Sequence, residues 1–132
     1  MSKLLLIDDD QDVSYSIRRN LESPEIELTT ASSGEEGLKV IPQLKPDLVL
    51  MDIRMGGING LETLRRIRQM DSKQLVILMT AYGTTQTAIE AMKLGAYDYL
   101  LKPFEVAKLK EVIGNALKAA RDMKQVVSYQ PL

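Results

Sequence analysis

The chain has 132 residues and a formal net charge of −1, with 45% hydrophobic and 27% charged residues. This length predicts one domain, and the composition is that of a globular protein rather than a disordered one. Because the sequence contains no cysteine and no histidine, disulfides, thiolate zinc sites and Ser-His catalysis are excluded. The balanced charge predicts that the chain does not bind nucleic acid directly.

The apolar runs of the sequence are far shorter than the ~20 residues that a membrane-spanning helix needs. The first run, Leu4–Ile7, is followed at once by aspartates, which is unlike a signal peptide. We therefore expect a soluble cytoplasmic protein that does not associate with membranes.

Five short apolar segments are predicted to be β-strands, and three of them are apolar at nearly every position, as in a parallel sheet buried on both faces. The segments are Leu4–Ile7, Leu28–Ala31, Leu48–Met51, Leu75–Met79 and Tyr97–Leu101. A stretch with the apolar spacing of a helix follows each of them. The pattern predicts an α/β fold, (βα)5, in which a parallel five-stranded sheet lies between two layers of helices.

Local signals mark several helix ends. Ser33 and Glu36 form a Ser-x-x-Glu capping box that predicts the start of the second helix. Pro42 lies inside this helix and predicts a kink or an early break. Gly95 is predicted to cap the C-terminus of the fourth helix.

The last helix has a continuous apolar stripe from Leu109 to Ala120. The pattern is lost from Val126 onward. We therefore expect residues 1–124 to form the domain and residues 125–132 to be a linker, truncated before an output domain.

Polar residues follow the central apolar runs. They are Asp8, Asp9 and Asp10 after the first run, Asp52 after the third, Thr80 after the fourth and Lys102 after the fifth. The carboxyl ends of parallel strands lie along one edge of a sheet, and ligands of open α/β sheets bind outside that edge. We therefore expect carboxylates, a hydroxyl and an ammonium group to converge there.

Neighbouring carboxylates repel one another, and a hard cation such as Mg²⁺ relieves this repulsion. With Mg²⁺ and a lysine beside it, a carboxylate can accept a phosphoryl group as an aspartyl phosphate. A simpler role also exists for part of the acidic run, because Asp10 or Asp12 can serve only to cap the first helix.

Five motifs in order resemble the receiver domains of two-component response regulators over residues 3 to about 122. They are Leu-Leu-Ile-Asp8-Asp9, Leu-Val-Leu-Met-Asp52-Ile-Arg-Met, Met-Thr80-Ala81, the segment from Ala91 to Tyr99, and Leu-Leu-Lys102-Pro103-Phe104. The similarity is greatest to receivers of the NtrC-like class. It implies the doubly wound strand order 2-1-3-4-5 of flavodoxin and CheY.

The resemblance implies a Mg²⁺ site and a phosphoacceptor. Asp52 would accept the phosphoryl group. Asp9, Asp52 and the backbone carbonyl of Arg54 would bind Mg²⁺ directly, and Asp8 would act mainly through water. The chain would be a signalling switch that promotes its own phosphorylation and dephosphorylation rather than an enzyme with a separate substrate.

The resemblance also implies a switch mechanism. Lys102 would pair with one phosphoryl oxygen, and Thr80 would donate a hydrogen bond to another after phosphorylation. Tyr99 would be the aromatic residue that turns inward when Thr80 moves, although it can also simply fill one face of its strand. Pro103 resembles the cis proline of the family.

The family implies two kinds of partner. A sensor histidine kinase would donate the phosphoryl group, and an ATPase or DNA-binding output domain would follow the receiver and control transcription. We also expect a homodimer formed through the fourth helix, fifth strand and fifth helix.

The chain departs from the family in the loop after Asp52, where Gly56-Gly57 replaces the usual Pro-Gly. Glycine lacks the fixed φ of proline, so the rigidity of this loop is in question. Arg54 and Tyr82 would flank the attacking water, and their bulk predicts slow loss of the phosphoryl group.

Three alternative functions fit the sequence less well. A haloacid-dehalogenase-like phosphatase needs a second acid two residues after its nucleophile, where this chain has Arg54. In a flavodoxin-like FMN carrier the first loop binds a phosphate, which Asp8, Asp9 and Asp10 would repel. A degenerate receiver that acts only as a binding module would lack one of the acceptor, metal or switch residues, and this chain keeps all of them.

Overall fold

The computed structural model describes residues 1–54, 57–81 and 85–129. Its five strands form one parallel sheet in the order β2-β1-β3-β4-β5, which confirms the predicted fold and strand order. The strands are β1 (Ser2–Ile7), β2 (Ile26–Ala31), β3 (Leu48–Asp52), β4 (Leu75–Thr80) and β5 (Asp98–Leu101). The helices are α1 (Gln11–Leu21), α2 (Gly34–Leu44), α3 (Gly60–Met70), α4 (Thr85–Lys93) and α5 (Val106–Tyr129).

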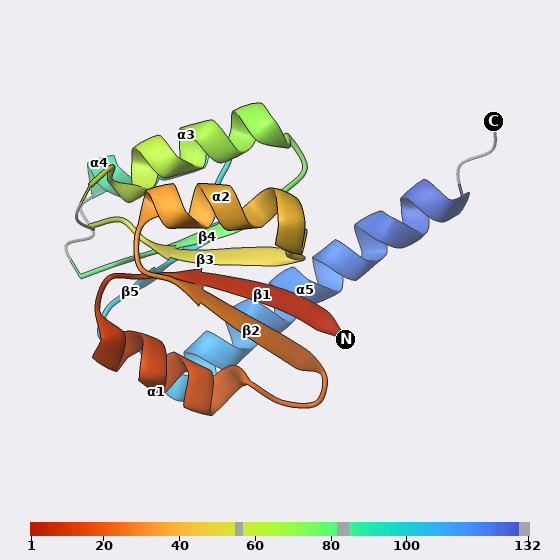
Figure 1. Cartoon of the computed structure of the whole chain (residues 1–132), viewed down its shortest axis with the longest axis horizontal. Helices are drawn as coiled ribbons and strands as arrows, with labels where there is room; N and C mark the ends of the chain where they lie inside the picture. The colour runs from red at the N-terminus through yellow and green to blue at the C-terminus, as the bar shows by residue number, and fades with distance from the viewer. Residues whose placement is uncertain (55–56, 82–84, 130–132) are drawn as a thin grey trace.

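The helices cover both faces of the sheet (Figure 1). Helices α1 and α5 pack on one face, where Ile17, Leu109 and Ile113 join strand residues in one buried cluster. Helices α2, α3 and α4 pack on the other face, and their buried side chains include Leu64 and Ala91. Every residue of β3 is buried, because both faces of the central strand are covered, as expected for a parallel sheet.

Side-chain caps begin α1, α2 and α3. An oxygen of Asp10 accepts hydrogen bonds from the amides of Asp12 and Val13, so Asp10 is the N-cap of α1. Ser33 and Asn59 cap α2 and α3 in the same way. Such caps satisfy amides that have no partner within the helix.

The α2 capping box differs in part from the prediction. Ser33 Oγ accepts from the Glu36 amide at 3.0 Å, as predicted. The Glu36 carboxylate, however, accepts from the amide and the hydroxyl of Ser32, one residue earlier than expected. Pro42 does not break the helix, which ends two residues later at Leu44, where Lys45 takes a left-handed conformation with φ of 51°.

Helix α5 is longer than its apolar stripe indicated. It continues to Tyr129, so the segment predicted to be a linker is helical over residues 125–129. Figure 1 shows this end of α5 projecting beyond the sheet. Among the helices of the described residues, none is long and apolar enough to cross a membrane.

Candidate functional site

The predicted site residues meet at the carboxyl edge of the sheet. In the sheet register, Ile7 lies between Ala31 and Met51, and Thr80 lies opposite Leu101. The polar residues that end or follow these strands therefore lie next to one another along the carboxyl edge of the sheet. The Lys102 amide donates to the Thr80 carbonyl at 2.8 Å, which fixes the start of the segment after β5 against the end of β4.

Three carboxylates form an acidic cluster. Asp8, Asp9 and Asp52 each offer an oxygen atom, and these atoms all lie within 4.8 Å of one another. Asp8 and Asp52 are buried, whereas Asp9 is exposed. Hard oxygen donors at this spacing suit Mg²⁺, which keeps several waters and binds proteins through a few carboxylates. The residues present therefore fit the metal that the sequence predicts.

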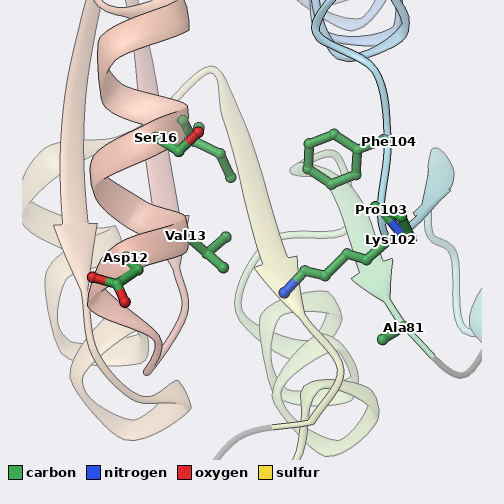
Figure 2. Close-up of a pocket in the computed structure, with 8 residues that line it drawn as sticks. Asp12, Val13, Ser16, Ala81, Lys102, Pro103 and Phe104 are labelled. Atoms are coloured by element: carbon green, nitrogen blue, oxygen red, sulfur yellow. The ribbon is translucent and has the colours of Figure 1, made fainter.

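Lys102 links two of these carboxylates. Its Nζ atom lies 2.9 Å from Asp52 Oδ2 and 3.3 Å from Asp8 Oδ2. Figure 2 shows its side chain reaching from the segment after β5 toward the end of β3. Burial alone would lower the pKa of Lys102, but the hydrogen bond to Asp52 and the charges of Asp8 and Asp52 outweigh it, so the pKa is raised. The ammonium group therefore stays charged.

Asp8 is held inside the site by its neighbours. Its Oδ1 accepts from the Asp10 amide at 2.9 Å, and its side chain has no exposed surface. Burial raises the pKa of Asp8, and the bond from Asp10 and the charge of Lys102 only partly oppose this rise. A cation bound nearby would stabilise its ionised form.

The turn that follows Asp52 is tightly built. Asp52 Oδ1 accepts from the Arg54 amide at 3.1 Å, and the Ile53 carbonyl accepts from the Gly60 amide at 2.7 Å. A Cβ atom on Gly60 would lie 2.7 Å from both the Asp52 carbonyl oxygen and the Ile53 Cα, so a side chain cannot fit there. Gly60 therefore shapes the turn after Asp52. Its only signal in the sequence is Asn59-Gly60, which marks a helix start and does not point to the site.

The predicted switch residues lie on neighbouring strands. Thr80 is buried at the end of β4. Tyr99 lies on β5 opposite Leu78 and packs, partly buried, against the cluster on the side of α2, α3 and α4. The bond between Lys102 and Pro103 is cis, as predicted. Gly56 and Tyr82 fall outside the described residues.

A cavity of about 510 Å³ opens beside the acidic cluster, between α1 and the segment after β5 (Figure 2). Val13, Ile17 and Phe104 give it apolar walls, and Lys102 also lines it. A group that enters this cavity therefore comes close to the ammonium group that contacts Asp52.

Comparison with known proteins identifies the family. The profile of the response regulator receiver domain matches residues 4–114. The chain belongs to this family. As a receiver domain it is neither a haloacid-dehalogenase-like phosphatase nor a flavodoxin, and the resemblance drawn from its motifs is confirmed.

Curated relatives are NtrC-like regulators. The chain is 33% identical to regulatory protein AtoC of Escherichia coli over 96% of its own length. It is 34% identical to the DNA-binding transcriptional regulator NtrC of Klebsiella pneumoniae over 91% of its length. The chain spans 27% and 26% of these relatives, about a quarter of each.

Solved receiver domains share the fold. The signal receiver domain of a putative Luxo repressor protein from Vibrio parahaemolyticus superimposes with a TM-score of 0.90 at 26% identity, covering 95% of this chain and 96% of that one. Response regulator TrrA from Thermotoga maritima, solved in complex with Mg²⁺-BeF, gives 0.79 at 33% identity, with coverage of 88% and 99%.

Proposed function

We propose that this receiver domain is a phosphorylation-activated switch whose phosphoacceptor is Asp52. The observation that carries the proposal is the placement of the Asp52 carboxylate, which lies in a cluster with Asp8 and Asp9 and 2.9 Å from the Lys102 ammonium. A nucleophile, a cation-binding acidic pair and a fixed positive charge are the parts that phosphoryl transfer to a carboxylate requires.

The phosphoryl group comes from a phosphorylated histidine of a sensor kinase. An Asp52 carboxylate oxygen attacks the phosphorus, the new O–P bond forms, and the N–P bond to the imidazole breaks. The bonding electron pair stays on the imidazole nitrogen, which takes up a proton from solvent. Lys102 remains charged and attracts a phosphoryl oxygen, which replaces part of its present contact with Asp8 and Asp52.

Asp9, Asp52 and the backbone carbonyl of Arg54 would hold Mg²⁺, and Asp8 would act mainly through a metal-bound water. When bound, Mg²⁺ supplies positive charge to the phosphoryl oxygens. The donor set supports this assignment, because Asp8, Asp9 and Asp52 offer clustered carboxylate oxygens, which are the ligands that Mg²⁺ prefers. The Mg²⁺-BeF complex of TrrA, a receiver that is 33% identical, also supports it.

The signal would leave the site through Thr80 and Tyr99. The Thr80 hydroxyl donates to a phosphoryl oxygen on Asp52, and Tyr99 moves inward into the space that Thr80 vacates. Phosphorylation can shift this equilibrium only by its differential affinity for the inward state. The surface formed by α4, β5 and α5 therefore changes, because Tyr99 lies on β5.

The partners follow from the same proposal. The cavity beside Lys102 admits the phosphohistidine of the kinase, because it is lined by the lysine that contacts Asp52 and has apolar walls that a kinase helix can cover. The relatives AtoC and NtrC are regulatory proteins, and NtrC is a DNA-binding transcriptional regulator. We propose that this receiver likewise controls an ATPase or DNA-binding output domain and works in the cytoplasm.

Mass spectrometry after incubation with acetyl phosphate and Mg²⁺ tests the proposal. We expect one phosphoryl group, mapped to Asp52, in the wild type and none in Asp52→Asn. Asp10→Asn is a matched control, because it changes another acid of the same edge that serves as a helix cap. Phosphorylation of Asp52→Asn at the wild-type rate would identify another nucleophile, and no phosphorylation of the wild type would indicate a degenerate receiver.

A further inference from the structure

The first turn of α2 contacts the connection between β3 and α3. Glu35 Oε2 accepts a hydrogen bond from the Ile58 amide at 3.3 Å, although the two residues are 23 positions apart. Glu35 is exposed and Ile58 is half-buried, so the bond lies at the rim of the molecule. The bond joins α2, which carries no proposed site residue, to the β3–α3 connection, which follows Asp52.

Two glycines let the surfaces approach this closely. Gly57 has a φ of 77°, and a Cβ atom there would lie 2.6 Å and 2.7 Å from the two carboxylate oxygens of Glu35. The carboxylate therefore lies directly against the backbone of Gly57. On the α2 side, a Cβ atom on Gly34 would lie 2.9 Å from Ile58 Cγ1. At both positions a side chain of the facing element occupies the space that a Cβ atom would need, the Glu35 carboxylate at Gly57 and the Ile58 side chain at Gly34.

The contact between Glu35 and Ile58 is close in sequence to a proposed metal ligand. Arg54, whose carbonyl we assign to the metal, lies four residues before Ile58. After Ile58, Asn59 caps α3 and Gly60 donates to the Ile53 carbonyl, so the end of the connection is fixed. The Glu35 bond adds a restraint on Ile58 from a separate element, α2.

The sequence gives a reason for such a restraint. Gly56-Gly57 follows Met55, where receivers usually have Pro-Gly. Glycine permits many more backbone conformations than proline, so a connection of this composition loses more entropy on ordering. An external hydrogen bond to Ile58 offsets part of that loss.

We propose that Glu35 is a positioning residue that holds the β3–α3 connection, and with it the Arg54 carbonyl, in the arrangement that binds Mg²⁺. The expected effect of Glu35 on Mg²⁺ affinity rests on the proposed function. The contact itself is independent of any metal and can be tested without one.

The experiment compares Glu35→Ala, Glu35→Gln and the wild type by amide hydrogen exchange at Ile58 without metal, and by calorimetric titration with Mg²⁺. We expect Glu35→Ala to speed exchange at Ile58 and to weaken Mg²⁺ binding, each by about threefold, the effect of one exposed hydrogen bond. Glu35→Gln keeps an acceptor oxygen and should restore both values to near those of the wild type.

Glu36→Ala is the matched control. The Glu36 carboxylate lies in the same helix turn but accepts from Ser32 rather than from the connection. It should lower the melting temperature and leave Mg²⁺ affinity and Ile58 exchange unchanged. The inference is overturned if Glu35→Ala leaves both values unchanged, or if Glu36→Ala changes them equally. A wild type that binds no Mg²⁺ would overturn the proposed function and the metal consequence, whereas Ile58 exchange would still decide whether the contact exists.

Discussion

Lys102 Nζ lies 2.9 Å from Asp52 Oδ2, although the two residues are 50 positions apart in the sequence. One strand separates β3 from β5 in the sheet, so the lysine side chain must cross the end of β4 to reach the carboxylate. The same ammonium lies 3.3 Å from Asp8. The arrangement places one positive charge between two buried acids, which reduces their repulsion until another cation arrives.

The length and shape of this side chain lead to the first prediction. Lys102→Arg should leave Mg²⁺ affinity within about twofold, because the carboxylates that bind the metal are unchanged. It should impair the response to beryllofluoride, since a planar fork replaces a compact charge that fits between Asp8 and Asp52. Two-dimensional amide spectra with and without Mg²⁺ and beryllofluoride measure the response.

Lys110→Arg is the control, because Lys110 is exposed on α5, away from the cluster. It should respond as the wild type does. A full response from Lys102→Arg would show that the charge alone, and not its geometry, is required.

The second prediction concerns Asp9 and Asp10, which are adjacent acids with different contacts. Asp9→Asn should weaken Mg²⁺ binding by about tenfold or more, because one of three clustered carboxylates loses its charge. Asp10→Asn should have little effect, since asparagine caps a helix about as well as aspartate and the Asp10 amide can still donate to Asp8. Calorimetric titration with Mg²⁺ measures both. Equal losses would contradict the division of roles.

Much of this site follows from the sequence, because a parallel sheet brings the residue after each strand to one edge. Asp8, Asp52 and Lys102 could therefore be placed together from strand ends alone. The contact between Glu35 and Ile58 could not, since it depends on how closely α2 approaches the β3–α3 connection. The partner of Glu36 could not be predicted from the sequence either, because it depends on the path of the chain at Ser32, before the helix begins.

The length of α5 was also underestimated from the sequence. The apolar stripe that faces the sheet ends near Ala120, because the sheet ends there, and the periodic signal ends with it. The helix itself continues to Tyr129. The periodic signal reports the face that packs on the sheet, so it cannot define the end of a helix that continues past the sheet.

The Glu36 contact gives a prediction of pH dependence. The hydrogen bonds from the Ser32 hydroxyl and amide lower the pKa of Glu36 below its usual value. A carboxyl group with a lowered pKa stabilises the fold above its unfolded-state pKa, and this contribution is lost as the pH falls through the folded-state value. Ser32→Ala should therefore be less stable than the wild type at neutral pH, and the difference should shrink in acid.

Urea unfolding between neutral and acidic pH measures this difference. Ser33→Ala serves as the comparison, because Ser33 accepts from a backbone amide and involves no titrating group. Its cost should be about 0.5–2 kcal/mol, typical of a lost N-cap, and independent of pH over this range. A Ser32→Ala difference that stays constant as the pH falls would rule out the contribution of Glu36.

The last prediction concerns assembly. Apolar side chains are exposed on α4, β5 and α5, and they include Ile89, Met92, Leu101 and Val106. We expect Mg²⁺ and beryllofluoride to favour a homodimer through this surface, because the proposed inward turn of Tyr99 on β5 would rearrange it. Sedimentation velocity with and without beryllofluoride measures the association. Leu101→Glu should weaken it by about tenfold or more, as expected for a charge placed at an apolar contact.

Met70→Glu is the matched control, since Met70 is 45% exposed and Leu101 49%, but Met70 lies at the end of α3 on another surface. It should leave association unchanged. Truncation after Ala120 tests the projecting end of α5 separately, because it removes residues beyond the apolar stripe and keeps the packed part of the helix. If the chain stays monomeric with and without beryllofluoride, the α4–β5–α5 surface has no role in assembly. If truncation also changes nothing, the end of α5 has none either.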